Sequence, residues 1–241
     1  YSKANVYTEA VDEYENAISL DPRFADARAA LGHILFAWAN SGDAWATKRD
    51  MLAKAQVLAD EALLMKEVPL GFLLQARISL FQKLKHEQAL SAARRALALD
   101  PNLAEAHATL GEILLYDGQL DEALNSLDQA ARLNPGFPEF YRFLKGQVKF
   151  HQGKYEAALE DMAGFCPTAA TRAYSTLCAF YQASAYAHIG NIAKAKSFFI
   201  GNMATLSTMA SLSTMIVVRY PFKCSGDVEK LLEGLAKFRP K

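Results

Sequence analysis

The chain has few cysteines, and their spacing fits neither a metal motif nor a disulfide framework. Its three cysteines, Cys166, Cys178 and Cys224, are widely separated, and no two of them form a Cys-x-x-Cys motif. An odd number of such cysteines argues against a fold held together by disulfides. We therefore predict that they act as small apolar side chains in the core.

An excess of charge of either sign is also missing. The sequence has 26 basic and 26 acidic residues, which gives a formal net charge of zero. Proteins that bind nucleic acid usually present a basic stripe, because contacts with phosphate supply much of their affinity. No such stripe is found here, so nucleic acid is not expected as a partner.

The motifs of common catalytic sites are absent. The sequence has no Gly-rich phosphate loop, no Gly-x-Ser-x-Gly and no His-Glu-x-x-His. Acidic pairs such as Asp121/Glu122 are interpreted as exposed helix faces rather than as general acids and bases. His151 and His188 could share a metal, but no carboxylate or cysteine joins them at ligand spacing. We predict no enzyme activity, no metal site and no cofactor.

The sequence has no uninterrupted apolar run long enough to cross a bilayer. The stretch between Lys196 and Arg219 has no charged residue and would be long enough. However, seven Ser, Thr and Asn residues interrupt it between Asn202 and Thr214, and each costs free energy in hydrocarbon. We predict a buried helix pair here and no transmembrane segment. The chain opens at Tyr1 without a signal peptide, which suggests a processed protein or a fragment, soluble in the cytoplasm or periplasm of a bacterium.

Proline and glycine are sparse, at 8 and 13 residues, while 51% of the residues are hydrophobic, with many Ala and Leu. This composition favours helices. Segments 89–101 and 123–135 share one pattern, in which small residues seven positions apart precede Asp-Pro or Asn-Pro. Pro101 and Pro135 are 34 residues apart. Small residues at this interval lie on one helix face and allow close packing, and proline ends the helix. The pattern predicts a helix-turn-helix repeat.

Segment 106–135 resembles a near-consensus tetratricopeptide repeat. The residues at the signature positions of that family are Leu110, Gly111, Gly118, Leu120, Ala123, Ala130 and Pro135. His107 stands where the family often has Trp. The resemblance implies an all-α fold in which antiparallel helix pairs stack into a right-handed α-solenoid.

Extending this register along the chain gives about five and a half repeats over residues 1–202, the first represented only by its second helix. An insertion near 42–52 is expected to lengthen the helices or to form an exposed loop. Residues 203–241 are predicted to be a non-repeat helical tail that packs on the array. This tail resembles those of bacterial proteins that fuse such repeats to nucleotide cyclase or winged-helix regulator domains, although no cyclase catalytic segment is present.

The family resemblance also implies which residues face the concave groove, since the first helix of each repeat lines it. The groove residues predicted in this way are mainly apolar and aromatic: His33, Phe36, Leu74, Ile78, Phe81, Glu112, Leu115, Tyr116, Phe143, Gln147, Phe150 and Phe180. Family members that clamp a chaperone carboxylate present Lys and Asn at these positions. Such a clamp is therefore not expected.

Three fates for this groove remain open. The chain's own tail, or the 203–218 segment, could fill it. A protein or peptide partner could bind in it, and charging Tyr116 and Phe143 would then abolish capture without unfolding the chain. A hydrophobic small molecule such as a lipid or sterol could instead occupy it, with His33, Glu112 and Gln147 as its polar contacts. We predict a non-catalytic binding module, most simply a protein-interaction scaffold, or else the regulatory region of a larger bacterial signalling protein.

Overall fold

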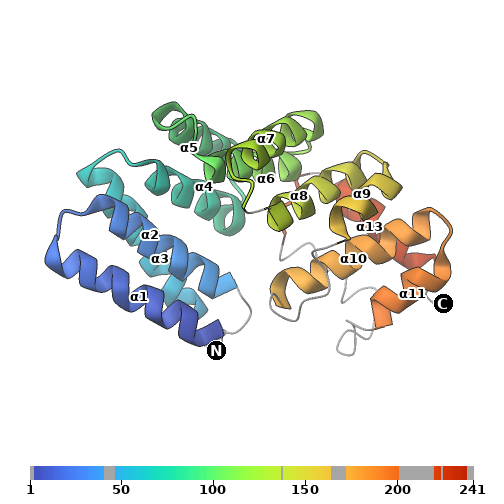
Figure 1. Ribbon diagram of the computed structural model, residues 1–241, viewed down its shortest axis with the longest axis horizontal. Helices are drawn as coiled ribbons and strands as arrows, with labels where there is room; N and C mark the ends of the chain where they lie inside the picture. The colour runs from blue at the N-terminus through green and yellow to red at the C-terminus, as the bar shows by residue number, and fades with distance from the viewer. Residues whose placement is uncertain are drawn as a thin grey trace. The chain divides into compact units, whose positions relative to one another are not determined.

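The computed structural model describes residues 3–40, 47–136, 138–163, 172–200, 220–223 and 225–237. These residues form twelve helices and no strand (Figure 1). The predicted all-α fold is therefore confirmed. The helices are α1 (Lys3–Leu20), α2 (Ala25–Asn40), α3 (Lys48–Met65), α4 (Pro69–Lys83), α5 (His86–Leu99), α6 (Ala104–Asp117), α7 (Leu120–Leu133), α8 (Pro138–His151), α9 (Tyr155–Met162), α10 (Arg172–His188), α11 (Ile192–Ile200) and α13 (Ser225–Ala236).

Successive helices pair as the repeat pattern predicts. Helix α2 packs against α3, α4 against α5, α8 against α9 and α10 against α11. We call α2, α4, α6, α8 and α10 the first helices and their partners the second helices. The chain divides into two compact units, unit 1 (Tyr1–Thr109) and unit 2 (Leu110–Lys241). Each is described by itself.

Short polar signals end the second helices. After α1 the Asp21 carboxylate accepts a hydrogen bond from the Arg23 N–H at 2.9 Å, and after α5 Asp100 does the same for Asn102 at 3.0 Å. In both places a proline lies between the two residues, so the helix cannot continue. The repeated Asp-Pro element is therefore a turn with its own hydrogen bond.

The predicted insertion near residues 42–52 overlaps the start of α3, which begins at Lys48. Helices α1 and α3 have 18 residues each, whereas α5 and α7 have 14 each, so the length of α3 is not particular to the insertion. Residues 41–46 lie outside the described residues, and the insertion stays a prediction.

Helices within a pair approach closely where the family signature places glycine. A Cβ at Gly111 of α6 would lie 2.7 Å from Leu127 Cγ and 3.1 Å from the Ala123 carbonyl oxygen, both on α7. Real side chains essentially never come so close, so no larger residue fits without moving the two helices apart. The signature glycine is explained by this contact.

The expectation for the cysteines is wrong for Cys178. This residue is fully buried on α10, as expected of an apolar filler, but it is disulfide-bonded. Cys166 and Cys224 lie outside the described residues. An odd count of three argued against a framework of several disulfides, but it does not exclude one bond.

Candidate interaction surface

The twelve predicted groove residues all lie on first helices, but most of them are inside the fold. Ten are buried, and only His33 and Phe81 are partly exposed. In unit 1, Leu74 and Ile78 belong to the core between α2, α3 and α4. In unit 2, Phe143, Phe150 and Phe180 belong to one core cluster. These side chains therefore pack in the core under the face of the first helices and do not form its solvent-exposed surface.

This burial overturns the expectation that Tyr116 and Phe143 could be charged without unfolding the chain. Tyr116 is 2% exposed and Phe143 is fully buried. A carboxylate at either position would have to be desolvated, which costs several kcal/mol. Variants at these two positions cannot separate binding from folding.

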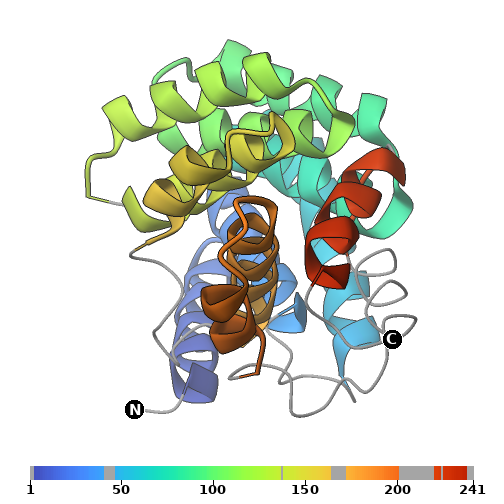
Figure 2. The same cartoon turned by 90° about the vertical axis from the view of Figure 1, so that its right-hand side faces the viewer.

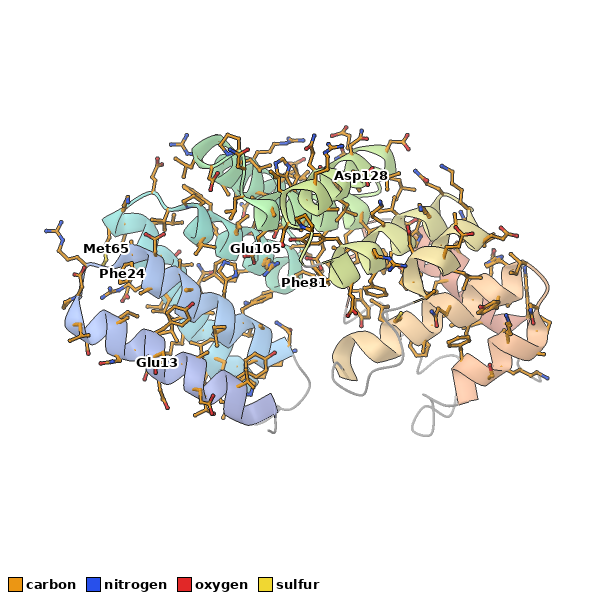
Figure 3. The ribbon with its side chains drawn as sticks, viewed as in Figure 1. Glu13, Phe24, Met65, Phe81, Glu105 and Asp128 are labelled. Atoms are coloured by element: carbon orange, nitrogen blue, oxygen red, sulfur yellow. The ribbon has the colours of Figure 1, made fainter. Side chains whose placement is uncertain are left out.

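Among the predicted groove positions of unit 1, the partly exposed aromatic residue is Phe81 on α4, labelled in Figure 3. Its ring meets that of Phe36 edge to face, with centroids 6.2 Å apart. Such an arrangement is a favourable aromatic geometry. Phe36 is itself buried, so Phe81 is the part of this pair that a partner could reach.

Polar groups lie beside these rings in unit 1. His33 on α2 donates its Nε2–H to the Leu70 carbonyl oxygen at 2.9 Å. Arg77 on α4 and Glu105 on α6 form an ion pair at 3.2 Å. Burial, together with the nearby Arg77 charge, lowers the pKa of His33 from 6.5 to about 4. The imidazole is therefore neutral at pH 7, and its Nδ1 atom is an acceptor.

In unit 2 an aromatic cluster surrounds Phe150 of α8, with rings from α9 and α10. The ring centroids of Tyr181, Tyr155 and His188 lie 5.0, 5.3 and 5.9 Å from that of Phe150. Gln147 and Glu112 are buried polar residues on the same face, and Gln147 Oε1 has no hydrogen-bond partner within the described part of the chain. The face here is closed by side chains of the protein itself.

The closing elements come from the C-terminal part of the chain. Residues Tyr220–Lys223 contact the end of α6, while helix α13, red in Figures 1 and 2, packs on α10 and contacts the last residue of α8. Phe222 packs edge to face on Tyr116 with centroids 5.0 Å apart, and the Lys223 N–H donates to the Tyr116 carbonyl oxygen at 2.9 Å. For unit 2 these contacts agree with the alternative in which the tail occupies the groove.

Sequence reasoning missed the polar partners of this segment. His151 Nε2 lies 2.7 Å from the Tyr181 hydroxyl, and its Nδ1 lies 3.3 Å from Asp227. His188 donates its Nε2–H to the Lys230 carbonyl oxygen at 3.0 Å. The sequence had shown that the two histidines hold equivalent positions in successive repeats. In the structure both contact the tail rather than each other.

Unit 1 also contains an open cleft of about 670 Å³ between α3, α4 and α5. Its lining is mostly polar and includes Gln56, Asp60, Gln75, Gln88, Arg95 and the ring of Phe72. A lipid would need an apolar pocket with few polar groups. This cleft does not have that character.

The described residues were also compared with what a metal site and a membrane-spanning helix require. Within the described ranges, no group of three or more His, Cys, Asp or Glu side chains could hold a metal ion. None of the described helices is both long and apolar enough to cross a bilayer. Residues 201–219, which include most of the uncharged stretch considered above, lie outside the described residues.

Comparison with known proteins agrees with the helix pairs and their signature glycines. Residues 80–145 match a family model described as tetratricopeptide repeat, and residues 1–37 match a second one described as TPR repeat. Both segments therefore resemble tetratricopeptide repeats. Repeats of this family generally serve as non-catalytic scaffolds for protein–protein interaction. Neither family model reaches the C-terminal tail, so its likeness to tails of cyclase or winged-helix fusion proteins stays a prediction.

One solved structure has the same fold as this chain, and a second is similar to part of it. A tetratricopeptide repeat protein from Parabacteroides merdae ATCC 43184 is 12% identical over 95% of this chain and 98% of its own, with a TM-score of 0.50. YrrB, described as a TPR protein with an unusual peptide-binding site, is 24% identical over 66% of this chain and 75% of its own, with a TM-score of 0.42. No curated protein matches.

Proposed function

We propose that this chain is a non-catalytic scaffold that binds a protein or peptide along the face of its first helices. One observation carries the proposal: in unit 2 this face already holds polypeptide, namely Tyr220–Lys223 and α13. Phe222 fits against Tyr116, and a main-chain hydrogen bond joins Lys223 to the end of α6. Side-chain packing combined with main-chain hydrogen bonding is how proteins commonly hold an added peptide.

The receiving surface follows the predicted groove positions. In unit 1 it comprises His33, Phe36, Leu74, Ile78 and Phe81, of which His33 and Phe81 are partly exposed. In unit 2 it comprises Glu112, Leu115, Tyr116, Phe143, Gln147, Phe150 and Phe180, which set the shape of the surface from within. Aromatic residues on such a face supply large contact area at low conformational cost.

A phage-displayed library of random 16-residue peptides, panned against the immobilised full chain, tests the scaffold. We expect enriched peptides whose binding weakens at least tenfold, or about 1.4 kcal/mol, in Phe81→Ala. Phe24→Ala is the matched control, because Phe24 is an exposed phenylalanine of unit 1 but lies in the turn before α2, as Figure 3 shows. The absence of any enriched peptide, or equal loss in both variants, would contradict the proposal.

The hydrophobic-ligand alternative makes a different prediction. A carrier of lipid or sterol would copurify with a stoichiometric small molecule, whereas a scaffold would not. Native mass spectrometry of the purified chain, followed by solvent extraction, distinguishes the two. A bound lipid mass would place the carrier first, and a bare protein mass after incubation with mixed lipids would remove it. The proposal that this scaffold regulates a larger bacterial signalling protein would be tested on the full-length protein.

A further inference from the structure

Three lysines of the C-terminal segment lie seven residues apart, and each meets the carboxyl end of a different first helix. The Lys223 ammonium contacts Asp117, the last residue of α6, at 2.8 Å. Lys230 Nζ donates to the carbonyl oxygen of His151, the last residue of α8, at 2.7 Å. Lys237 Nζ donates to Nδ1 of His188, the last residue of α10, at 3.2 Å. The three contacts therefore follow three consecutive repeats.

Only Lys230 lies within α13, whereas Lys223 precedes the helix and Lys237 follows its last residue, Ala236. The segment therefore presents one lysine at each of three successive helix ends: one before the helix, one within it and one after it. Each helix end carries partial negative charge, which a lysine complements.

An apolar stripe accompanies the lysines and holds α13 in place. Val228, Leu231 and Leu235 are buried, and Leu231 and Leu235 are fully so. Their spacing of three and four residues places them on one side of the helix. Ser184 of α10 donates its hydroxyl to the Leu231 carbonyl oxygen at 2.9 Å. The segment is held by charge at Lys230 and at the two flanking lysines, and by burial along this stripe.

The closest approach lies at Gly234. A Cβ at this position would lie 2.0 Å from Ser184 Oγ and 2.8 Å from Ser184 Cα, so the backbone of α13 rests directly on α10. At Gly226, in the first turn of the same helix, an added Cβ would meet nothing within 4 Å. The surface therefore demands a small residue at one position of the bound helix and not at the other.

We propose that the carboxyl ends of α6, α8 and α10 form a docking surface for a segment of a partner protein that contains an amphipathic helix and three lysines at seven-residue intervals, one within the helix and one beyond each end. In this chain α13 covers the surface, and its contacts show which side chains the surface binds. The inference rests on the proposed scaffold function and specifies its ligand in unit 2. A partner helix binds by replacing α13.

The experiment uses the full chain and a fluorescent peptide of residues 220–237 carrying Cys224→Ser. Gly234→Ala in the chain should expel α13 from α10 while favouring its helical state, because alanine is the better helix former by about 1 kcal/mol. Gly226→Ala makes the same chemical change without the clash. Both variants are measured by fluorescence anisotropy with a reducing agent present, since Cys178 is disulfide-bonded. We expect Gly234→Ala to bind the peptide at least tenfold more tightly than the wild type or Gly226→Ala.

A second peptide tests the lysine spacing at constant composition. Glu229→Lys with Lys230→Glu moves one ammonium by a single position, about 100° around the helix, and places a carboxylate at the end of α8. We expect at least tenfold weaker binding to the Gly234→Ala chain. Equal binding of the two peptides would overturn the recognition of lysine spacing and leave the scaffold standing. A folded Gly234→Ala chain that binds neither peptide, nor any peptide from the random library, would overturn both proposals.

The wild-type chain supplies the test if Gly234→Ala loses helix content by circular dichroism. Saturating peptide should then replace α13, and the amides of residues 228–236 in the chain should exchange with solvent at least tenfold faster. Unchanged exchange at saturating peptide would overturn the proposal.

Discussion

At the scale of single residues, backbone conformation separates one turn from its equivalents. Gly118, Gly153 and Gly190 end first helices with φ between 79° and 85°, and among the described residues other than glycine only Leu84 has a positive φ, at 50°. Leu84 closes α4 in the same way and is 64% exposed. A left-handed conformation costs a residue with a Cβ about 1–2 kcal/mol relative to glycine.

We therefore predict that Leu84→Gly stabilises the protein by about 0.5–1 kcal/mol, since strain relief exceeds the entropy gained by the unfolded chain. The reciprocal change, Gly190→Leu, should destabilise it by about 1 kcal/mol or more. An added Cβ at Gly190 has nothing within 4 Å, so only its φ of 82° opposes the leucine. Urea unfolding of the two variants measures both effects. Equal destabilisation by both variants would refute the argument.

His33 gives a prediction about pH. Its pKa is lowered to about 4 in the folded protein by burial, then by the charge of Arg77, against 6.5 ordinarily. Because the folded pKa is depressed, the neutral ring stabilises the fold fully above pH 6.5, and this contribution is lost as the pH falls toward 4. The loss approaches about 1.4 kcal/mol per pH unit within this window.

Urea unfolding of the wild type and of His33→Gln at pH 7, 6 and 5 tests this expectation. Glutamine can still donate to the Leu70 carbonyl oxygen but does not titrate. The difference in unfolding free energy between the two proteins should shrink as the pH is lowered. A difference that stays constant from pH 7 to pH 5 would show that the ring is not buried in its neutral form.

At the scale of helices, α1 packs against α2 through a stacked aromatic pair. The rings of Tyr7 and Trp38 have centroids 5.7 Å apart and an angle of 8° between their planes. Tyr7 lies in the first half of α1, and its neighbour Val6 is 58% exposed. The stacked pair therefore fixes this half of the helix.

Tyr7→Ala should lower the free energy of local opening of α1 by about 1–2 kcal/mol, because aromatic pairs contribute beyond the area they bury. Hydrogen exchange of the amides of residues 6–14 measures this loss. Val6→Ala, which removes apolar atoms one residue away from a solvent-exposed site, serves as the control and should leave exchange almost unchanged. Similar effects of the two variants would mean that the stack does not hold α1.

The helix pairs were predictable from the sequence because local chemistry specifies them. The small residues of α5 and α7, the Asp-Pro turns and the left-handed glycines each act within a few residues of their own position. The resting place of α13 was not predictable in the same way. Its contacts with Ser184 and His151 join residues more than forty positions apart, and the lysine interval gains meaning only once the first helices lie side by side.

At the scale of the whole molecule, the sequence and the structure agree on class and differ on surface. Helical periodicity identifies the face of each first helix but does not say whether that face meets solvent or another part of the chain. Phe143 and Phe180 fit the predicted groove positions and yet are fully buried. By contrast, Leu20 and Leu64 are 81% and 86% exposed, although they are the same residue type as the leucines of the core.

The sequence by itself determined that this chain is all-α, that its helices pair in repeats of about 34 residues, and where the turns fall. These properties follow from propensity, from small residues at helix contacts and from proline and glycine at helix ends, all of which are local. Only the tertiary structure decided which apolar residues remain accessible and that unit 2 holds its own C-terminal helix. Whether a side chain is buried, and whether a surface is covered by another segment, depends on contacts between residues far apart in the chain. The free energy of such contacts cannot be deduced from any one short segment of the sequence.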